Sequence, residues 1–101
     1  MKYILGIDSG GTKYLVRACT PEGGVVAEYV GPPAPHYRLE REEVIKRVNA
    51  NIDACLAKFG GSRKECVYLV CGTTGLDTDR DQQAVDDIYK AFPALCVGII
   101  V

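Results

Sequence analysis

The residues with the clearest chemical potential lie near the amino terminus, where residues 6–13 read Gly-Ile-Asp-Ser-Gly-Gly-Thr-Lys. An apolar, β-branched run ends at Asp8, and Gly10 and Gly11 follow it. Glycine allows the backbone to take positive φ and leaves no side chain between the N–H groups and a bound anion. Consecutive amides in such a turn form an anion-binding concavity. We therefore interpret residues 10–13 as a candidate phosphate-binding hairpin.

The side chains around this turn extend the same chemistry. Thr12 offers a hydroxyl to a phosphate group, and Lys13 offers a positive charge. The Asp8 carboxylate would repel phosphate oxygens without an intervening cation, so its position implies Mg²⁺ held largely through water. A plain Gly-Gly hairpin turn, with Asp8 as an ordinary turn residue, explains the same spacing equally well. The pattern lacks the spacing of a P-loop, and a strand rather than a helix follows it, unlike a dinucleotide fingerprint.

Three strands joined by glycine-containing turns are predicted to position this hairpin. The runs 3–7, 12–19 and 25–30 are apolar and rich in β-branched residues. This pattern predicts an antiparallel meander. Residues 31–35 include three prolines, which neither pair in a ladder nor continue a helix. The meander is therefore expected to end there.

Two helices are predicted further along the chain. In the first, over residues 40–59, apolar residues recur at steps of three and four. They are Val44, Val48, Ile52, Cys55 and Phe59. In the second, Thr78 and Asp81 fit a capping box at the start, and Pro93 marks the end. Its buried side is predicted to carry Val85, Ile88 and Phe92.

An apolar strand is predicted after each of these helices. Residues 66–70 form an uninterrupted apolar run, which predicts a strand covered on both faces, and residues 95–101 form another. Residues 72–75 form a glycine-containing loop between the first of these strands and the second helix. The resulting order, β-β-β-α-β-α-β, predicts an α/β fold with helices packed on a mixed sheet.

Composition argues against several functional classes. Charges of both signs are interspersed and sum to −1, so no basic footprint of a nucleic-acid-binding protein is present. No apolar run approaches the roughly 20 residues of a membrane span. The first apolar run is too short for a signal peptide, so we expect a cytoplasmic protein. The five cysteines are odd in number and lack CxxC spacing, which argues against a disulfide framework or a zinc site.

Residues 3–13 resemble the first phosphate motif of the actin/hexokinase/Hsp70 superfamily of ATPases. Within that superfamily, the chain resembles N-acetylglucosamine kinase-like proteins and the BadF/BadG/BcrA/BcrD-type ATPase family. The likeness extends through Gly31, His36 and Tyr37, the long helix, and the loop at 72–75. It implies a ribonuclease H-like fold, with residues 1–101 as part of the amino-terminal lobe of an actin-like ATPase and the second lobe absent.

The resemblance implies roles for the residues around the hairpin. Asp8 would orient Mg²⁺ and its water, while Gly10, Gly11, Thr12 and Lys13 would approach the phosphates of ATP. ATP and Mg²⁺ are therefore the expected ligands.

The family resemblance also implies which residues lie near the substrate that accepts the phosphate, here called the acceptor. Residues 31–37 correspond to a sugar-contacting segment, and Gly72 and Thr73 would flank the acceptor pocket. His36, the only histidine, is expected to be a surface or substrate-lining residue rather than a general base. Pro35 stands where the amino-sugar kinases usually carry Asn, so the acceptor stays open.

No catalytic residue is expected within the chain, because the family's general base is an aspartate just beyond the strand that contains Val101. The implied function is the amino-terminal part of an ATP-dependent sugar or amino-sugar kinase, inactive by itself, that transfers the γ-phosphate to a hydroxyl. An ATPase activator of an acyl-CoA dehydratase or reductase and a non-enzymatic α/β domain stay open as alternatives. The expected partners are a nucleotide and a sugar rather than nucleic acid or a membrane, and a homodimeric parent protein stays open.

Overall fold

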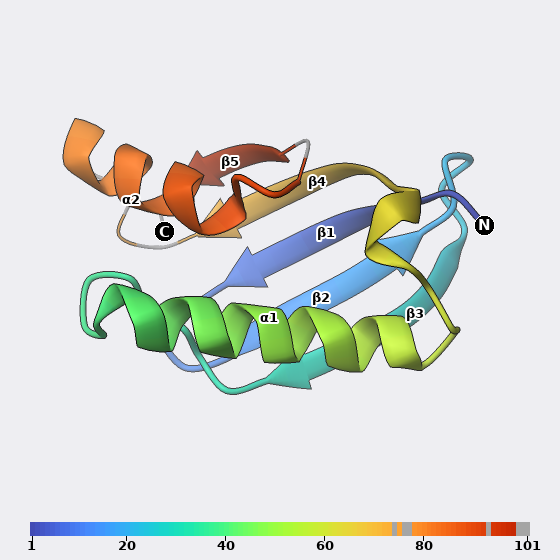
Figure 1. The fold of residues 1–101 in the computed structure, drawn as a ribbon, viewed down its shortest axis with the longest axis horizontal. Helices are drawn as coiled ribbons and strands as arrows, with labels where there is room; N and C mark the ends of the chain where they lie inside the picture. The colour runs from blue at the N-terminus through green and yellow to red at the C-terminus, as the bar shows by residue number, and fades with distance from the viewer. Residues whose placement is uncertain (74, 76–77, 93, 99–101) are drawn as a thin grey trace.

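In the part of the chain that the structure describes, one mixed sheet has five strands in the order β3-β2-β1-β4-β5 (Figure 1). The computed structural model describes residues 1–73, 75, 78–92 and 94–98, with side chains as far as residue 92. The elements are β1 (Tyr3–Ser9), β2 (Tyr14–Cys19), β3 (Val25–Gly31), α1 (Arg41–Ala57), η1 (Arg63–Glu65), β4 (Cys66–Thr73), α2 (Asp79–Tyr89) and β5 (Ala94–Gly98). The predicted order of strands and α-helices is confirmed, and the 3₁₀ helix η1 is an addition to it. Residues 99–101 of the predicted last strand, and Pro93, lie outside the described residues.

Strand direction changes at β1. The β1–β2 and β2–β3 pairs are antiparallel, which confirms the predicted meander, whereas the β1–β4 and β4–β5 pairs are parallel. In the parallel β1–β4 pair, Asp8 lies opposite Gly72 and Ser9 lies opposite Thr73. The carboxyl ends of β1 and β4 therefore meet at one edge of the sheet, where the hairpin also lies.

Both helices pack on the same face of the sheet. Alternate side chains of β1 and β2 point into a single core, including Leu5 and Val16, and meet Ile52 of α1 and Val85 of α2 there. The hydroxyl oxygens of Tyr14 on β2 and Tyr89 on α2 lie 2.5 Å apart in this core. One side of the sheet therefore holds the buried apolar residues of both helices.

The prediction that β4 is covered on both faces is wrong. Val67, Tyr68 and Val70 are 46%, 39% and 39% exposed, whereas Leu69 and Cys71 are fully buried. The reason is that, in the described part of the chain, α1 and α2 lie on the same side of the sheet. An apolar run therefore marks this strand without showing how many of its faces are covered.

Helix α1 is slightly shorter than predicted but buries the predicted stripe. Val44, Val48, Ile52 and Cys55 are all buried, and Phe59, beyond the helix, packs edge-to-face on Tyr3 with ring centroids 5.4 Å apart.

Asn51 is a buried polar member of the same helix face that the apolar pattern did not reveal. Only 2% of it is exposed, and its Nδ2 donates to the Pro32 carbonyl at 3.1 Å. This bond ties the proline-containing segment after β3 to the helix.

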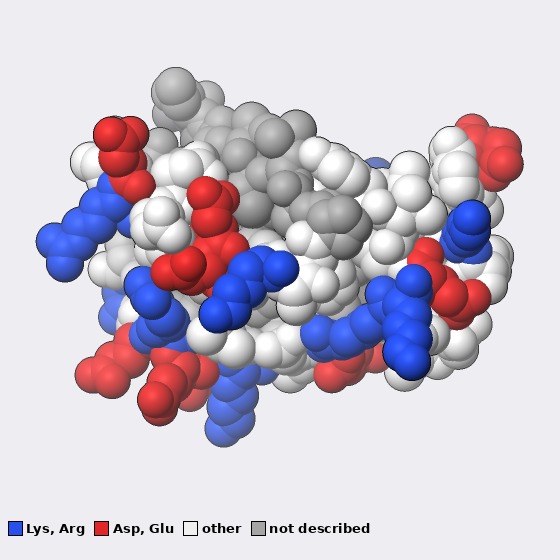
Figure 2. Space-filling model, turned by 45° about the horizontal axis from the view of Figure 1, so that its top comes forward, with Lys and Arg blue, Asp and Glu red and all other residues white. Residues whose placement is uncertain are grey.

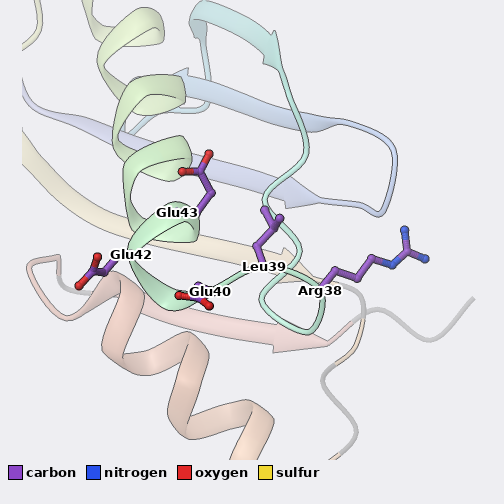
Figure 3. A pocket seen from close by; sticks show the side chains of 5 residues that line it. All are labelled: Arg38, Leu39, Glu40, Glu42 and Glu43. Carbon is purple, nitrogen blue, oxygen red and sulfur yellow. The ribbon is translucent and has the colours of Figure 1, made fainter.

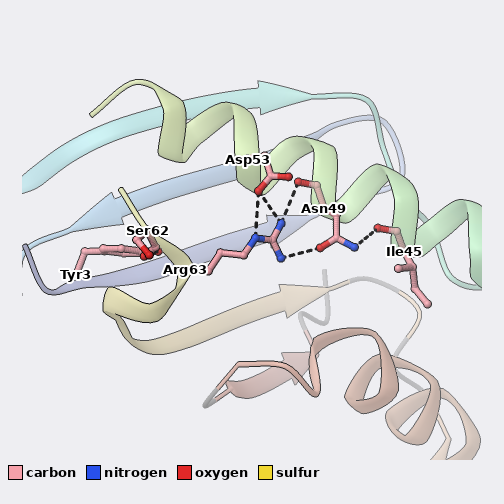
Figure 4. Close-up of polar contacts among 6 residues, drawn as sticks. All are labelled: Tyr3, Ile45, Asn49, Asp53, Ser62 and Arg63. Atoms are coloured by element: carbon pink, nitrogen blue, oxygen red, sulfur yellow. Dashed lines mark hydrogen bonds and ion pairs between the residues drawn. The ribbon is translucent and has the colours of Figure 1, made fainter. Parts of the chain in front are cut away.

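Polar contacts join the carboxyl half of α1 to the segment before β4 (Figure 4). The Arg63 guanidinium donates to Asp53 Oδ1 at 2.7 Å and to Asn49 Oδ1 at 2.8 Å. The Tyr3 hydroxyl donates to the Ser62 carbonyl at 2.8 Å. Burial raises the pKa of Tyr3 to about 12. Together these contacts hold η1 between α1 and the start of β1.

The predicted capping box at the start of α2 is confirmed, because Thr78 Oγ1 accepts from the Asp81 amide at 3.1 Å while Asp81 Oδ2 accepts from the Thr78 amide at 3.1 Å. Val85 is buried as predicted, and Ile88 and Phe92 are partly buried. Tyr89 is the more deeply buried residue of that turn, at 3% exposure. Its spacing of four from Val85 was the signal for it.

Candidate functional site

The candidate phosphate hairpin connects β1 to β2 through residues 10–13. Its turn is held by a hydrogen bond that the Gly10 amide donates to the Lys13 carbonyl at 3.0 Å. Neither Gly10 nor Gly11 has positive φ, so the prediction that they use it is wrong. The turn instead requires glycine because neighbouring atoms leave little room for a side chain at these two positions. A Cβ added at Gly10 would lie 3.3 Å from the Lys13 carbonyl oxygen, and one at Gly11 would lie 3.4 Å from the Tyr37 hydroxyl.

The backbone amides in this turn differ in whether they already donate a hydrogen bond. The Gly10 amide is engaged within the turn, whereas the described part of the chain holds no acceptor for the amides of Gly11 and Thr12. The side chains of Thr12 and Lys13 are exposed. The turn thus presents two unengaged N–H groups, a hydroxyl and an ammonium group to solvent, which are the donors that a phosphate group needs.

Asp8 places a carboxylate beside these donors. It is exposed at the carboxyl end of β1, next to Gly72, which has no side chain. Among the described residues, no group of three or more His, Cys, Asp or Glu could hold a metal ion by itself. A single carboxylate nevertheless fits Mg²⁺, which keeps several waters and is bound by one or two carboxylates together with substrate phosphates. The donor set therefore fits a metal that arrives with a nucleotide.

The predicted acceptor residues of β4 lie at the same edge of the sheet. Thr73 is 4% exposed and lies opposite Ser9, which is 6% exposed, so both are buried polar residues beside the hairpin. Sequence reasoning did not single out Ser9. Its position one residue after Asp8, at the end of a predicted strand, was the available signal.

The sequence predicted His36 to be a surface or substrate-lining residue, and the structure contradicts the first of these alternatives. Its side chain is only 7% exposed, and its Nε2 lies 3.1 Å from the Gly75 carbonyl oxygen and 3.5 Å from Asp81 Oδ1. It thereby connects the segment after β3 to the segment that opens α2. Its role toward an acceptor stays a proposal.

One buried cluster lies beneath the site. Tyr14 directly follows the hairpin, and its hydroxyl meets that of Tyr89. Burial, with Tyr14 and Cys71 nearby, raises the pKa of Tyr89 well above its ordinary value. The Tyr89 hydroxyl thus stays neutral and anchors α2 to the strand that leaves the hairpin.

An open depression lies beside the amino terminus of α1 (Figure 3). The depression is lined by Arg38, Leu39, Glu40, Glu42 and Glu43, so three carboxylates surround it. None of the predicted site residues lines it. The face seen in Figure 2 carries acidic and basic side chains side by side. No helix among the described residues is long and apolar enough to cross a membrane.

Comparison with known proteins decides the family. The family model for BadF/BadG/BcrA/BcrD ATPases matches residues 5–95, from β1 into β5. The chain belongs to this ATPase family. Its resemblance to the family, inferred from the hairpin and the later elements, is thereby confirmed.

A curated relative of this chain is about three times as long. An N-acetylmuramic acid/N-acetylglucosamine kinase of Clostridium acetobutylicum is 32% identical over 91 residues, which cover 90% of this chain and 30% of the kinase. The chain therefore spans about a third of the length of that relative.

Solved structures show the same fold. A protein of Chromobacterium violaceum, provisionally named an N-acetylglucosamine kinase, superposes with a TM-score of 0.75 at 17% identity, covering 97% of this chain and 35% of that protein. Component A of the Acidaminococcus fermentans (R)-2-hydroxyglutaryl-CoA dehydratase superposes with a TM-score of 0.63 at 14% identity, covering 98% and 30% of the two chains. The predicted fold class is confirmed: an α/β sheet like that of the amino-terminal lobe of an actin-like ATPase.

Proposed function

We propose that this chain is the phosphate-binding part of the first lobe of an ATP-dependent kinase that acts on a sugar or amino sugar. The observation that carries the proposal is the β1–β4 register. It brings the Asp8 carboxylate and the unengaged amides of Gly11 and Thr12 to the same sheet edge as Gly72 and Thr73. ATP, the phosphate donor, and a sugar, the phosphate acceptor, could meet at this edge.

The hairpin would bind the phosphates of ATP. The Gly11 and Thr12 amides would donate to phosphate oxygens, and Lys13 would add positive charge. Asp8 would hold Mg²⁺ through water, and the bound metal would neutralise charge on the phosphates. The absence of side chains at Gly10 and Gly11 would let the backbone approach the nucleotide closely.

The acceptor side would lie toward β4. Gly72 would leave room beside Asp8, and Thr73 and His36 are the other proposed substrate-binding residues. The acceptor class is inferred from the amino-sugar kinase of Clostridium acetobutylicum, the curated relative.

By itself this chain should not transfer phosphate. Phosphoryl transfer depends on several elements that position the donor, metal, acceptor and base together. Residues 1–101 would supply one of them, as part of a single ATPase lobe, with the catalytic aspartate and second lobe of the kinase lying elsewhere. The proposal therefore concerns binding by this chain and catalysis by a longer protein.

Titration of the 101-residue chain with ATP and Mg²⁺, followed by amide chemical shifts, tests the binding step. We expect affinity on the order of millimolar or weaker, because most adenosine and phosphate contacts of a complete kinase would be absent. The amides of residues 10–13 should shift most. Asp8→Asn should remove the enhancement by Mg²⁺ and leave metal-free ATP binding unchanged or stronger.

Glu22→Gln is the matched control, because Glu22 is an exposed carboxylate in the turn between β2 and β3. It should leave the Mg²⁺ effect intact. A triphosphate that shifts amides elsewhere while residues 8–13 stay unmoved would contradict the proposed function.

A further inference from the structure

Tyr37 lies between two segments that are far apart in the sequence. A Cβ added at Gly11 of the hairpin would lie 3.4 Å from the Tyr37 hydroxyl, and one added at Gly75 would lie 2.5 Å from its Cδ1. The hydroxyl end of the ring is thus beside the hairpin, and its edge is against the backbone between β4 and α2. One side chain therefore lies next to both sides of the proposed site.

The residues around Tyr37 keep its ring in this place. His36 packs edge-to-face on it, with centroids 5.3 Å apart, and is itself held by the Gly75 carbonyl and Asp81. The Arg38 guanidinium lies 5.5 Å from the ring centroid. The ring itself is 44% exposed, so these neighbours and Gly75 hold it from one side.

Gly75 is suited to this contact for two reasons. Its φ of +77° favours glycine, and a side chain at this position would enter the space that the Tyr37 ring occupies. The ring and the glycine therefore fit each other closely. Displacing one should move the other.

From this geometry we infer that Tyr37 is a positioning residue that couples the phosphate hairpin to the segment between β4 and α2. The inference deepens the proposed function, on which its relevance to nucleotide binding rests. A change at the hairpin on phosphate binding would reach Gly75 through the ring, and so reach the proposed acceptor side. The coupling itself is a mechanical property of the chain and is present without ligand.

Amide chemical shifts of the ligand-free chain test the coupling directly. Gly75→Ala should displace the Tyr37 ring and shift the Gly11 amide resonance. In a Tyr37→Ala background, the same substitution should no longer shift Gly11, because the connecting ring is gone. Gly60→Ala is the matched control, since Gly60 also has positive φ, +69°, but nothing lies within 4 Å of the added Cβ.

Two single variants keep the test decisive if Gly75→Ala does not fold. Tyr37→Ala should shift both the Gly11 and Gly75 amides, and Tyr37→Phe should shift Gly11, which lies beside the lost hydroxyl. A Gly11 amide that ignores Gly75→Ala in the Tyr37 chain, or that shifts equally in both backgrounds, overturns the inference. So does a Tyr37→Ala variant in which neither amide moves.

Titration with ATP and Mg²⁺ separates this inference from the proposed function. In the natural chain, both the hairpin amides and Gly75 should shift, and Tyr37→Ala should keep the hairpin response but lose that of Gly75. Tyr37→Phe should weaken the Gly75 response, because the lost hydroxyl is the atom of Tyr37 that lies beside Gly11. A Gly75 response that persists in Tyr37→Ala overturns the coupling, whereas hairpin amides that never respond contradict the proposed function and leave the ligand-free result standing.

Discussion

Single glycines in this chain are required for two different physical reasons. Gly75 has positive φ, whereas Gly10, Gly11 and Gly31 do not. At Gly31 the constraint is crowding, because an added Cβ would lie 2.7 Å from Asn51 Cγ and 2.7 Å from Tyr29 Cε2. A glycine in the sequence therefore indicates either an unusual backbone conformation or a close neighbour, and only the structure separates the two.

Gly31→Ala is expected to destabilise the chain by about 1–3 kcal/mol, the usual cost of overpacking. The added methyl group would force Asn51 away and strain its bond to the Pro32 carbonyl. Urea unfolding measures the change. Gly6→Ala is the control, because its nearest neighbour would lie at an ordinary 3.9 Å, and it should cost far less. Equal losses in the two variants would show that the Asn51 contact is unimportant.

At the scale of elements, α2 is held to the rest of the fold by a buried hydroxyl pair. Tyr89 meets Tyr14, which lies directly after the hairpin, so the helix and the proposed phosphate site share a strand. Burial disfavours the charged form of Tyr89, so loss of its proton at high pH would weaken this packing. The attachment of α2 should therefore depend on pH at the alkaline end.

The pKa of Tyr89 determines whether stability rises or falls with pH. It is raised above its ordinary value of 10.0 by burial and by Tyr14 and Cys71. The folded chain resists loss of this proton more than the unfolded chain does. The resulting stability is fully present below about pH 10 and is lost as pH rises through the folded pKa. Urea midpoints measured across that range should fall, and the fall should be smaller in Tyr89→Phe.

Tyr89→Phe should also cost about 1 kcal/mol at neutral pH, because one hydrogen bond is lost. Tyr68→Phe, on the exposed face of β4, serves as the control and should leave the alkaline profile as it is. A Tyr89→Phe profile identical to that of the natural chain would mean that other groups cause the alkaline loss.

At the scale of the whole molecule, the sheet has one covered face and one face open to solvent in the described part of the chain. The open face carries apolar side chains, among them Tyr68 and Val70. Sheets with parallel strands are usually covered on both faces. An apolar surface of this kind favours association between molecules.

Val70→Lys is expected to raise the solubility of the chain while changing the free energy of unfolding by no more than about 0.5 kcal/mol, as for most surface substitutions. Leu69→Lys, at the neighbouring position of the same strand, should instead unfold the chain, because Leu69 is fully buried. Precipitation limits and urea unfolding measure the two effects. A Val70→Lys variant as unstable as Leu69→Lys would show that the open face is covered.

Much of this molecule followed from local patterns. Apolar spacing located α1 and its stripe from Val44 to Cys55, Thr78 and Asp81 identified the start of α2, and the glycine-containing turns placed the meander. These features depend on residues a few positions apart, so the amino-acid sequence determined them by itself. The hairpin and the order of elements also carried the family resemblance.

The tertiary structure decided what depends on residues far apart in the chain. Packing of both helices on one face left Val70 exposed, and the contact with Gly75 and Asp81 buried His36. The β1–β4 register set Asp8 beside Gly72, and Tyr37 came to lie between Gly11 and Gly75. No periodicity encodes such contacts, because each depends on how separate elements fill the space between them.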